Sequence, residues 1–510
     1  MRAFRMMLAA GLVVAAGAMG AWPAAAAEKD GKAAAAAPEA APRVWRKEET
    51  IALAGQKIAY EARAATLILK DDKGRPEAEI FHIAYLKKGA DPERRPITFL
   101  WNGGPGSASL WLHMGAFGPK RVVAPADARD DGGPPYPIVD NPASLLDVTD
   151  LVFVDPVGTG FSRALGERKN EDFYGIEKDA EAMARFIRRF LSENGRWNSP
   201  KFIGGESYGT TRTAAVVRAL EGGVNDVALN GLVLISTILD FSARAEVPGN
   251  EMAYVVLLPT MAATAWYHGK VNPRPPLEEF LAEARAFAAG SYLQALMKGA
   301  ALTDPERAEI RRRLAHFTGL SEEYLDRAHL RVGLFRYMKE LLRDRGLVVG
   351  RLDSRYTGRD ADDAGERPEM DPSFYGIDGI YTAAINRYLR QDLGVDVDRE
   401  YLTISGLGAR WDWTISDGRR PFYLNLAPFI GQALRQNRDL GVFVAAGWYD
   451  FATPFFGAEL ALSRPGIPQD RIAFHYYPAG HMMYVEEESL KRLAEDLRAF
   501  IRARTHPPRP

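Results

Sequence analysis

The segment Gly205-Glu206-Ser207-Tyr208-Gly209 limits what this chain of 510 residues can fold into more than any other feature. It reads G-x-S-x-G and lies between an apolar run at 201–204, which predicts a short buried strand, and a predicted helix at 213–220. A serine on the sharp turn between a strand and a helix is called a nucleophile elbow. Its glycines are needed because the turn is strained and a Cβ at either position would clash.

Short apolar runs alternate with helical patterns along the chain, which is typical of a mostly parallel sheet with helices on both faces. The apolar stripe of Leu490, Leu493, Leu497 and Ile501 predicts a terminal helix. With the elbow, this pattern predicts an α/β class protein with the α/β-hydrolase fold. The predicted strands are 65–69 and 78–86, which form an antiparallel hairpin, then 97–101, 151–154, 202–204, 232–235, 442–446 and 472–476.

Residues 243–424 differ from the rest because helical periodicity replaces the alternation of strand and helix. We expect this segment to be a large, mainly helical cap insertion. It would divide the catalytic domain into a first part, 44–242, and a second part, 425–510.

The N-terminus predicts a signal peptide over residues 1–27. Arg2 and Arg5 precede the apolar run 6–20, and Ala25-Ala26-Ala27 forms a small-residue cleavage site. An uncleaved anchor is the alternative, although the apolar run is short for a membrane span. Residues 28–43 are rich in Ala and Pro and predict a flexible linker. We therefore expect an exported protein, periplasmic or secreted, with no membrane contact after signal cleavage.

Composition excludes several kinds of chemistry. The chain has no cysteine, which rules out disulfides, thiol nucleophiles and cysteine-based zinc sites. Its formal net charge of −1 gives no reason to expect a nucleic acid partner. We expect neither a metal nor a cofactor, and the sequence does not indicate an oligomeric state.

A serine hydroxyl becomes a good nucleophile only beside a base, and the base needs a carboxylate to fix its tautomer. In this fold the order is serine, acid, histidine. His481, in the loop after the last predicted strand, fits as the base; a plain surface or core histidine is the alternative. The other histidines precede the serine, fall in the expected cap, sit inside a strand or lie in the tail: His82, His113, His268, His316, His329, His475 and His506.

Asp450 follows the predicted strand 442–446 and therefore lies at its carboxyl end, where open α/β sheets place their chemistry. We expect it to orient His481, although an aspartate that caps the helix near Pro454 is the other interpretation. The glycine-rich turn Asn102-Gly103-Gly104-Pro105-Gly106 follows strand 97–101 and would expose backbone N–H groups to an oxyanion. A phosphate loop is excluded because no Gly-Lys-Ser/Thr follows, but a plain tight turn remains an alternative.

These motifs together resemble the serine carboxypeptidase family. The resemblance is carried by separate motifs in the family's order: Trp101 to Gly106, Asp155-Pro156-Val157-Gly158-Thr159-Gly160-Phe161-Ser162, Gly205 to Gly209, Asp450, and Gly480-His481-Met482. It implies Ser207 as nucleophile, His481 as base and Asp450 as its partner, and the Asp155 loop is expected to shape the site. It further implies an oxyanion hole from the N–H groups of Gly104 and Tyr208.

In this family the asparagine of the glycine turn and the glutamate before the serine bind the free carboxylate of the substrate. Here these residues are Asn102 and Glu206. A carboxyl group can accept a carboxylate only if one of the two is protonated, so Glu206 would need a raised pKa. A glutamate that only satisfies the elbow is the alternative.

The chain departs from the family at three positions. Ala116 stands where a second glutamate usually shares a proton with the first, which puts the family's acidic optimum in doubt. Ser107 replaces a half-cystine, and Tyr484 replaces the proline that follows the His-Met pair. The side-chain preference of the family lies in the cap and cannot be carried over.

The resulting hypothesis is a serine-type carboxypeptidase that acts on peptides with a free C-terminus through an acyl-enzyme. An esterase or acyltransferase on the same scaffold is the alternative, because fold does not fix function. The third hypothesis is a binding protein that keeps the fold but has no catalytic activity. Trp411 and Trp413 either pack in the core or line a pocket.

Overall fold

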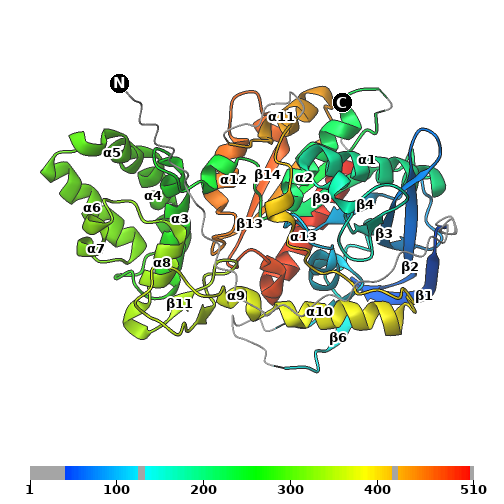
Figure 1. Cartoon of the computed structure of the whole chain (residues 1–510), viewed down its shortest axis with the longest axis horizontal. Helices are drawn as coiled ribbons and strands as arrows, with labels where there is room; N and C mark the ends of the chain where they lie inside the picture. The colour runs from blue at the N-terminus through cyan, green and yellow to red at the C-terminus, as the bar shows by residue number, and fades with distance from the viewer. Residues whose placement is uncertain (1–40, 125–132, 225, 416–422, 506–510) are drawn as a thin grey trace, which may run out of the picture. The chain divides into compact units, whose positions relative to one another are not determined.

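The computed structural model describes residues 41–124, 133–224, 226–415 and 423–505 (Figure 1). The predicted signal peptide and residues 28–40 of the predicted linker lie outside these ranges. Within the described residues, no helix is both long and apolar enough to cross a membrane. Nor do the described side chains include a group of three or more His, Asp or Glu arranged to hold a metal ion.

The core of the chain is a ten-stranded sheet in the order β1-β2-β3-β7-β4-β9-β10-β13-β14, with β8 paired to β3. Strands β1 to β3 are antiparallel, as is the β3–β7 pair, and the strands from β7 to β14 run parallel. The order and the mostly parallel pairing confirm the predicted α/β-hydrolase fold. The bounds are Val44–Leu53 (β1), Gln56–Lys70 (β2), Pro76–Lys87 (β3), Ile97–Trp101 (β4), Asp150–Val154 (β7), Arg163–Ala164 (β8), Lys201–Glu206 (β9), Gly231–Ile235 (β10), Gly441–Gly447 (β13) and Ile472–Tyr477 (β14).

Both faces of the sheet are covered, as the continuous apolar strands require. In β10 the side chains alternate: Leu232 and Leu234 pack with one set of helices, Val233 and Ile235 with another. The first set is α1 (Ile176–Glu193), α2 (Tyr208–Glu221) and α11 (Ala427–Gln436). The second set includes α10 (Asp378–Arg387) and α13 (Glu487–Thr505), whose predicted apolar stripe is buried.

The described residues of 243–424 are mainly helical and contribute to three hydrophobic clusters, one of them through Leu407, Trp411 and Leu424, which pack with α1, α2 and α11. The part up to Val349 forms its own cluster, together with α12 (Phe455–Leu462) and the loop after β13. Figure 1 shows this group at the β13 side of the sheet, while α10 lies farther along the sheet. Residues from Tyr356 to Tyr401 instead pack into the core of the sheet. The elements are α3 (Met252–Tyr267), α4 (Leu277–Phe287), α5 (Leu293–Lys298), α6 (Asp304–Thr318), α7 (Glu322–Arg327), α8 (Leu334–Glu340), β11 (Val348–Val349), β12 (Thr357–Gly358) and α9 (Pro372–Tyr375).

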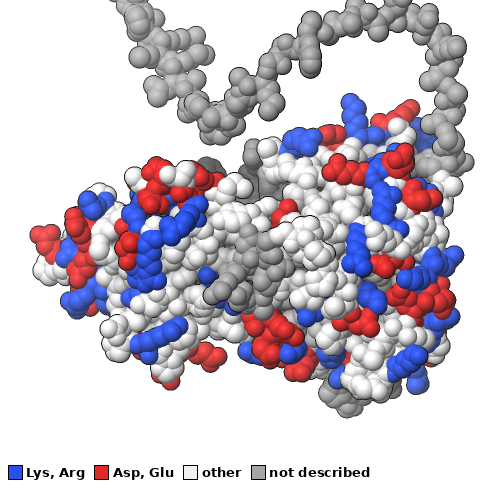
Figure 2. All heavy atoms as spheres, turned by 90° about the horizontal axis from the view of Figure 1, so that it is seen from below, with Lys and Arg blue, Asp and Glu red and all other residues white. Residues whose placement is uncertain are grey.

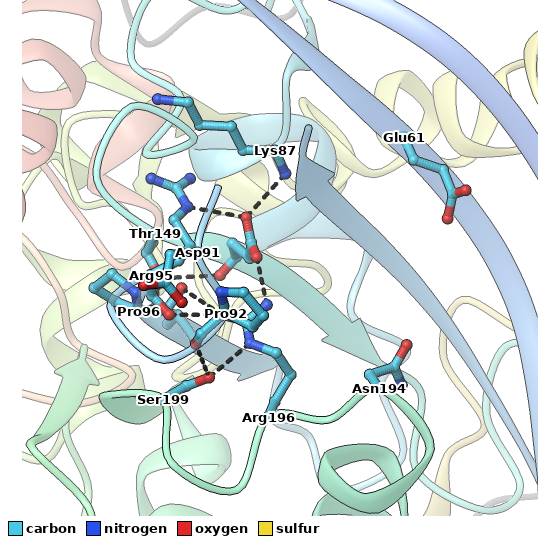
Figure 3. Close-up of polar contacts among 12 residues, drawn as sticks. Glu61, Lys87, Asp91, Pro92, Arg95, Pro96, Thr149, Asn194, Arg196 and Ser199 are labelled. Carbon is cyan, nitrogen blue, oxygen red and sulfur yellow. Dashed lines mark hydrogen bonds and ion pairs between the residues drawn. The ribbon is translucent and has the colours of Figure 1, made fainter. Parts of the chain in front are cut away.

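A buried ion cluster fixes the amino edge of the parallel strands (Figure 3). Asp150, the first residue of β7, accepts from Arg95 Nε at 3.0 Å and from an Arg196 terminal nitrogen at 2.5 Å. Arg196 also donates to the carbonyl of Arg95 and to Ser199 Oγ, both at 2.6 Å. The cluster ties the segment before β4 to the loop after α1. It lies at the opposite edge from the candidate site and stabilises the sheet.

Candidate active site

Ser207 occupies the turn between β9 and α2 with φ of 60°, in the left-handed region that non-glycine residues rarely adopt. The neighbouring glycines make this turn sterically accessible. A Cβ on Gly205 would lie 2.3 Å from the carbonyl oxygen of Gly209, and one on Gly209 would lie 2.9 Å from the carbonyl oxygen of Trp101. The local geometry is therefore that of a nucleophile elbow.

Asp450 and His481 lie at the carboxyl ends of β13 and β14 and contact each other. His481 Nδ1 is 2.7 Å from Asp450 Oδ2, and both side chains are buried. The other carboxylate oxygen accepts the backbone N–H groups of Ala452 and Thr453 at 2.7 and 3.0 Å. These bonds hold the carboxylate in place, so Asp450 both fixes the imidazole and organises the turn into α12.

Burial disfavours the charged imidazole of His481, but the Asp450 carboxylate and its hydrogen bond outweigh burial and raise its pKa above the ordinary value. Ser207 and His481 line the same cavity of about 410 Å³. Their side chains are not hydrogen-bonded to each other in this structure. Hydrogen bonds between such side chains are often long before substrate binds, and both residues face the same cavity.

The glycine turn after β4 packs directly on the elbow. A Cβ on Gly103 would lie 2.6 Å from both the carbonyl oxygen of Glu206 and the backbone nitrogen of Tyr208. Gly104 lines the cavity with Ser207 and has φ of 100°. The amide of Tyr208 is in the first turn of α2, where N–H groups have no intrahelical acceptor. Two backbone donors are thus available beside Ser207.

Asn102 and Glu206 are buried side chains that also line this cavity. Asn102 Oδ1 accepts the backbone N–H of Leu112 at 3.1 Å, which fixes the amide orientation. Its buried Nδ2 makes no hydrogen bond of good geometry with the described residues, although the Asn102 side chain lies close enough to Glu206 and Tyr484 to lower the pKa of both. Glu206 Oε2 accepts from the hydroxyl of Tyr484 at 2.6 Å. Burial raises the pKa of Glu206 to about 7, although His481 and Tyr484 both act to lower it.

Tyr484 occupies the region beside Ala116, where the sequence lacks a second glutamate. Ala116 is buried in the turn Leu112–Phe117. A Cβ on the adjacent Gly115 would lie 2.7 Å from both the Tyr484 ring and the Tyr381 hydroxyl. A tyrosine from the loop after β14 therefore supplies the hydroxyl partner of Glu206.

The Asp155 loop contacts the segment that follows the glycine turn. Asp155 Oδ1 accepts the backbone N–H of Ser109 at 2.8 Å, and burial raises the pKa of Asp155 to about 7. Trp411 is buried and donates to the hydroxyl of Tyr208 at 2.9 Å. Trp413 lines a second cavity of about 280 Å³, with Tyr208, Phe241 and Ser207.

Sequence reasoning missed two arginines in the main cavity. Arg244, from the turn Phe241–Arg244 after β10, and Arg351, just after β11, line it together with Ser207. Phe335, Phe374 and Ile404 complete its wall. No motif surrounds either arginine; the only signal is that Arg244 follows the carboxyl end of a predicted strand.

Comparison with known proteins gives a consistent but partial match. The sequence model described as serine carboxypeptidase matches residues 72–263, which include the glycine turn and the elbow. "Serine carboxypeptidase-like 13" of Arabidopsis thaliana is 26% identical over 166 residues, 32% of this chain and 37% of that protein. "Serine carboxypeptidase-like 26" of the same plant is 30% identical over 155 residues, 30% of this chain and 31% of that protein. The matched region thus spans about a third of the length of these relatives.

Among solved structures, proline iminopeptidase from Mycobacterium smegmatis is 14% identical and has a TM-score of 0.37, covering 87% of this chain and 98% of its own. A monoglyceride lipase variant from Saccharomyces cerevisiae is 12% identical with a TM-score of 0.35, covering 84% and 93%. TM-scores this low give no information about function. The chain has the α/β-hydrolase fold by its own sheet topology, and it is similar to serine carboxypeptidases over the region that carries the elbow and the glycine turn.

Proposed function

We propose that this chain is a serine-type carboxypeptidase, which releases the C-terminal residue of a peptide through an acyl-enzyme on Ser207. The observation that carries the proposal is the buried Nδ2 of Asn102, which makes no hydrogen bond of good geometry with the described residues, next to a protonatable Glu206 in the cavity that Ser207 lines. This pair matches the needs of a terminal carboxylate, which accepts hydrogen bonds from both groups. The match to the serine carboxypeptidase family over residues 72–263 supports it.

In the proposed reaction, Ser207 Oγ attacks the carbonyl carbon of the last peptide bond while His481 accepts its proton. Asp450 holds His481 through the 2.7 Å contact and stabilises the imidazolium. The N–H groups of Gly104 and Tyr208 receive the oxyanion, each contributing about 3 kcal/mol in the transition state. The C–N bond then breaks as His481 protonates the leaving amine, and water, deprotonated by His481, hydrolyses the acyl-enzyme.

Recognition of the terminal carboxylate depends on the protonation of Glu206. Below about pH 7 the carboxyl of Glu206 is neutral, because burial has raised its pKa to about 7, and it can donate to the substrate. Asn102 Nδ2 donates the second hydrogen bond. Above that pH the two carboxylates repel each other, so binding weakens.

We propose in addition that residues 243–424 cap the site and that residues 1–27 direct export, most simply to a bacterial periplasm. The first proposal is supported by Phe335, Arg351 and Ile404, which lie in this segment and line the cavity. The second rests on the sequence pattern alone.

The test compares an N-blocked dipeptide with its C-terminal amide, at pH 6 and with Asn102→Ala alongside. We expect the free acid to be cleaved with a kcat/KM at least tenfold higher, and Asn102→Ala to reduce this difference. Equal cleavage of acid and amide would reject carboxylate recognition. Turnover of simple esters that exceeds that of every peptide, with Ser207 still required, would favour the esterase or acyltransferase alternative.

A further inference from the structure

We propose that Arg244 and Arg351 form a binding subsite for a second negative charge on the substrate, the acidic side chain of the C-terminal residue. The inference rests on the proposed function, since it assigns the preferred residue to the same site. Both arginines line one cavity with Asn102, Glu206 and Ser207.

Arg244 carries a charge that no described residue neutralises directly. Its guanidinium makes no hydrogen bond or ion pair with the described part of the chain, and its side chain is exposed to the cavity. The nearest acidic neighbour in sequence, Glu246, accepts the backbone N–H of Leu334 at 2.8 Å instead. Arg244 is therefore free to meet an anion that enters the cavity.

Arg351 is only partly compensated. Its Nε lies 3.7 Å from Asp371 Oδ2, beyond hydrogen-bonding distance, and its side chain is 31% exposed. Asp371 already accepts the backbone N–H groups of Arg351 and Ser373 and the hydroxyl of Ser373. The Arg351 guanidinium thus keeps donors available to the cavity.

The two arginines influence each other. Part of the Arg244 side chain is open to the cavity, but the surrounding protein still desolvates its guanidinium. This desolvation and then the positive charge of Arg351 lower the pKa of Arg244, while Asp450 and Glu246 act against this. Two cations in one partly desolvated cavity are unfavourable unless an anion joins them. Glu206 does not provide that anion when it is protonated, and its Oε2 already accepts from Tyr484. Within the described residues, Asp371, Asp450 and Glu246 act on the pair without a hydrogen bond to either guanidinium, so a substrate anion is the group that could bind both arginines directly.

The position of the pair selects the residue that is released. Both arginines line the cavity that contains Asn102 and Glu206, where the terminal carboxylate binds in the proposed reaction. The adjoining cavity, with Ile238, Phe241 and Trp413 in its wall, is more apolar and includes only Arg244 of the two. The acyl side of the substrate would occupy this second cavity.

The charges on the outer surface give no reason to expect a preference for acidic substrates. On the face seen in Figure 2, acidic and basic side chains are interspersed, without a large region of one sign. The formal net charge of the chain is −1. Preference for an acidic substrate would therefore arise inside the cavity, through direct contact rather than long-range attraction.

The experiment measures kcat/KM for N-blocked dipeptides that end in Glu, Gln or Leu. The enzymes are the wild type, Arg244→Gln, Arg351→Gln and, as a matched control at a solvent-facing position of α1, Arg189→Gln. Glu and Gln differ in charge but hardly in shape. We expect the wild type and the control to prefer Glu over Gln at least tenfold, as hydrogen bonds to charged groups imply. Each cavity variant should lose most of this preference, measured as the ratio of kcat/KM for the Glu and Gln peptides, whatever its rate with the Leu peptide.

Equal rates for Glu and Gln peptides in the wild type would overturn the proposal. So would cavity variants that keep the Glu preference but stop distinguishing a free C-terminus from its amide, because the arginines would then bind the terminal carboxylate. If no peptide is cleaved, inhibition of 4-nitrophenyl acetate hydrolysis by free glutamate and glutamine tests the subsite separately. Stronger inhibition by glutamate that depends on Arg244 and Arg351 supports it, and equal inhibition rejects it.

Discussion

The hydroxyl of Tyr484 donates a 2.6 Å hydrogen bond to Oε2 of Glu206, the residue before Ser207. The two residues are 278 positions apart and meet only because β9 and β14 end at the same edge of the sheet. A tyrosine can donate to Glu206 whether the carboxyl is charged or neutral, whereas a second glutamate donates only when it is protonated itself. Tyr484 therefore takes the place of the second acid as a donor to Glu206, and its hydrogen bond favours the charged carboxylate and so lowers the pKa of Glu206.

Tyr484→Phe should move the alkaline limb of peptide cleavage to higher pH. The hydrogen bond from Tyr484 lowers the pKa of Glu206, so its loss raises that pKa. We expect a shift of about one pH unit, which corresponds to about 1.4 kcal/mol. The measurement is kcat/KM against pH for a dipeptide and for a simple ester. A shift of the ester profile by the same amount would contradict this role.

Glu206→Gln should remove the alkaline limb near pH 7 for peptides. The amide of glutamine stays neutral at every pH, so it cannot repel the substrate carboxylate as ionised Glu206 does. The acidic limb should remain, because His481 loses activity when it gains a proton below its raised pKa. A variant whose pH profile is the same as that of the wild type would exclude Glu206 from carboxylate recognition.

Asp450→Asn should lower kcat by about 10⁴-fold, because His481 would be held in the wrong tautomer. Stability should change little, since the backbone N–H groups of Ala452 and Thr453 can still donate to the side-chain oxygen. Steady-state kinetics and thermal unfolding on the same sample separate the two effects. A loss below tenfold would mean that another acid serves His481.

Asp150→Asn should destabilise the fold by about 3–5 kcal/mol, because Arg95 and Arg196 would be left buried without their counter-charge. Chemical denaturation measures this free energy of unfolding. Glu193→Gln is the matched control, since the exposed Arg189–Glu193 pair on α1 should contribute less than about 1 kcal/mol. Equal losses in the two variants would show that the buried cluster adds nothing specific.

The fold could be predicted well where strands are apolar on both faces. Strands β4, β7, β9, β10 and β13 are buried along their whole length, whereas β14 is a partly exposed edge strand, and the order of these strands located the elbow, Asp450 and His481. β1 was not predicted because it is an edge strand. Charged side chains such as Lys47 and Glu49 interrupt the alternation of apolar and polar residues that would have indicated a strand.

The residues that line the substrate-binding cavity were harder to predict from the sequence. Arg244, Arg351 and Tyr484 come from separate loops, and no spacing rule links them to Ser207. The division of residues 243–424 among three hydrophobic clusters depends on packing against α12 and against both faces of the sheet, which periodicity does not report. The local sequence pattern predicts the helices, the strands and the reactive residues at the strand ends. The residues that form the cavity wall depend instead on contacts between distant parts of the chain.

Labelling with a fluorophosphonate, followed by intact and peptide mass spectrometry, addresses the reactive alcohol most directly. We predict one adduct per chain, located on Ser207, that is absent in Ser207→Ala and forms far more slowly in His481→Ala. Ser207→Ala should also lower peptide turnover by about 10⁶-fold. An adduct on another residue, or none on a folded wild-type chain, would contradict the assignment of Ser207 as the nucleophile.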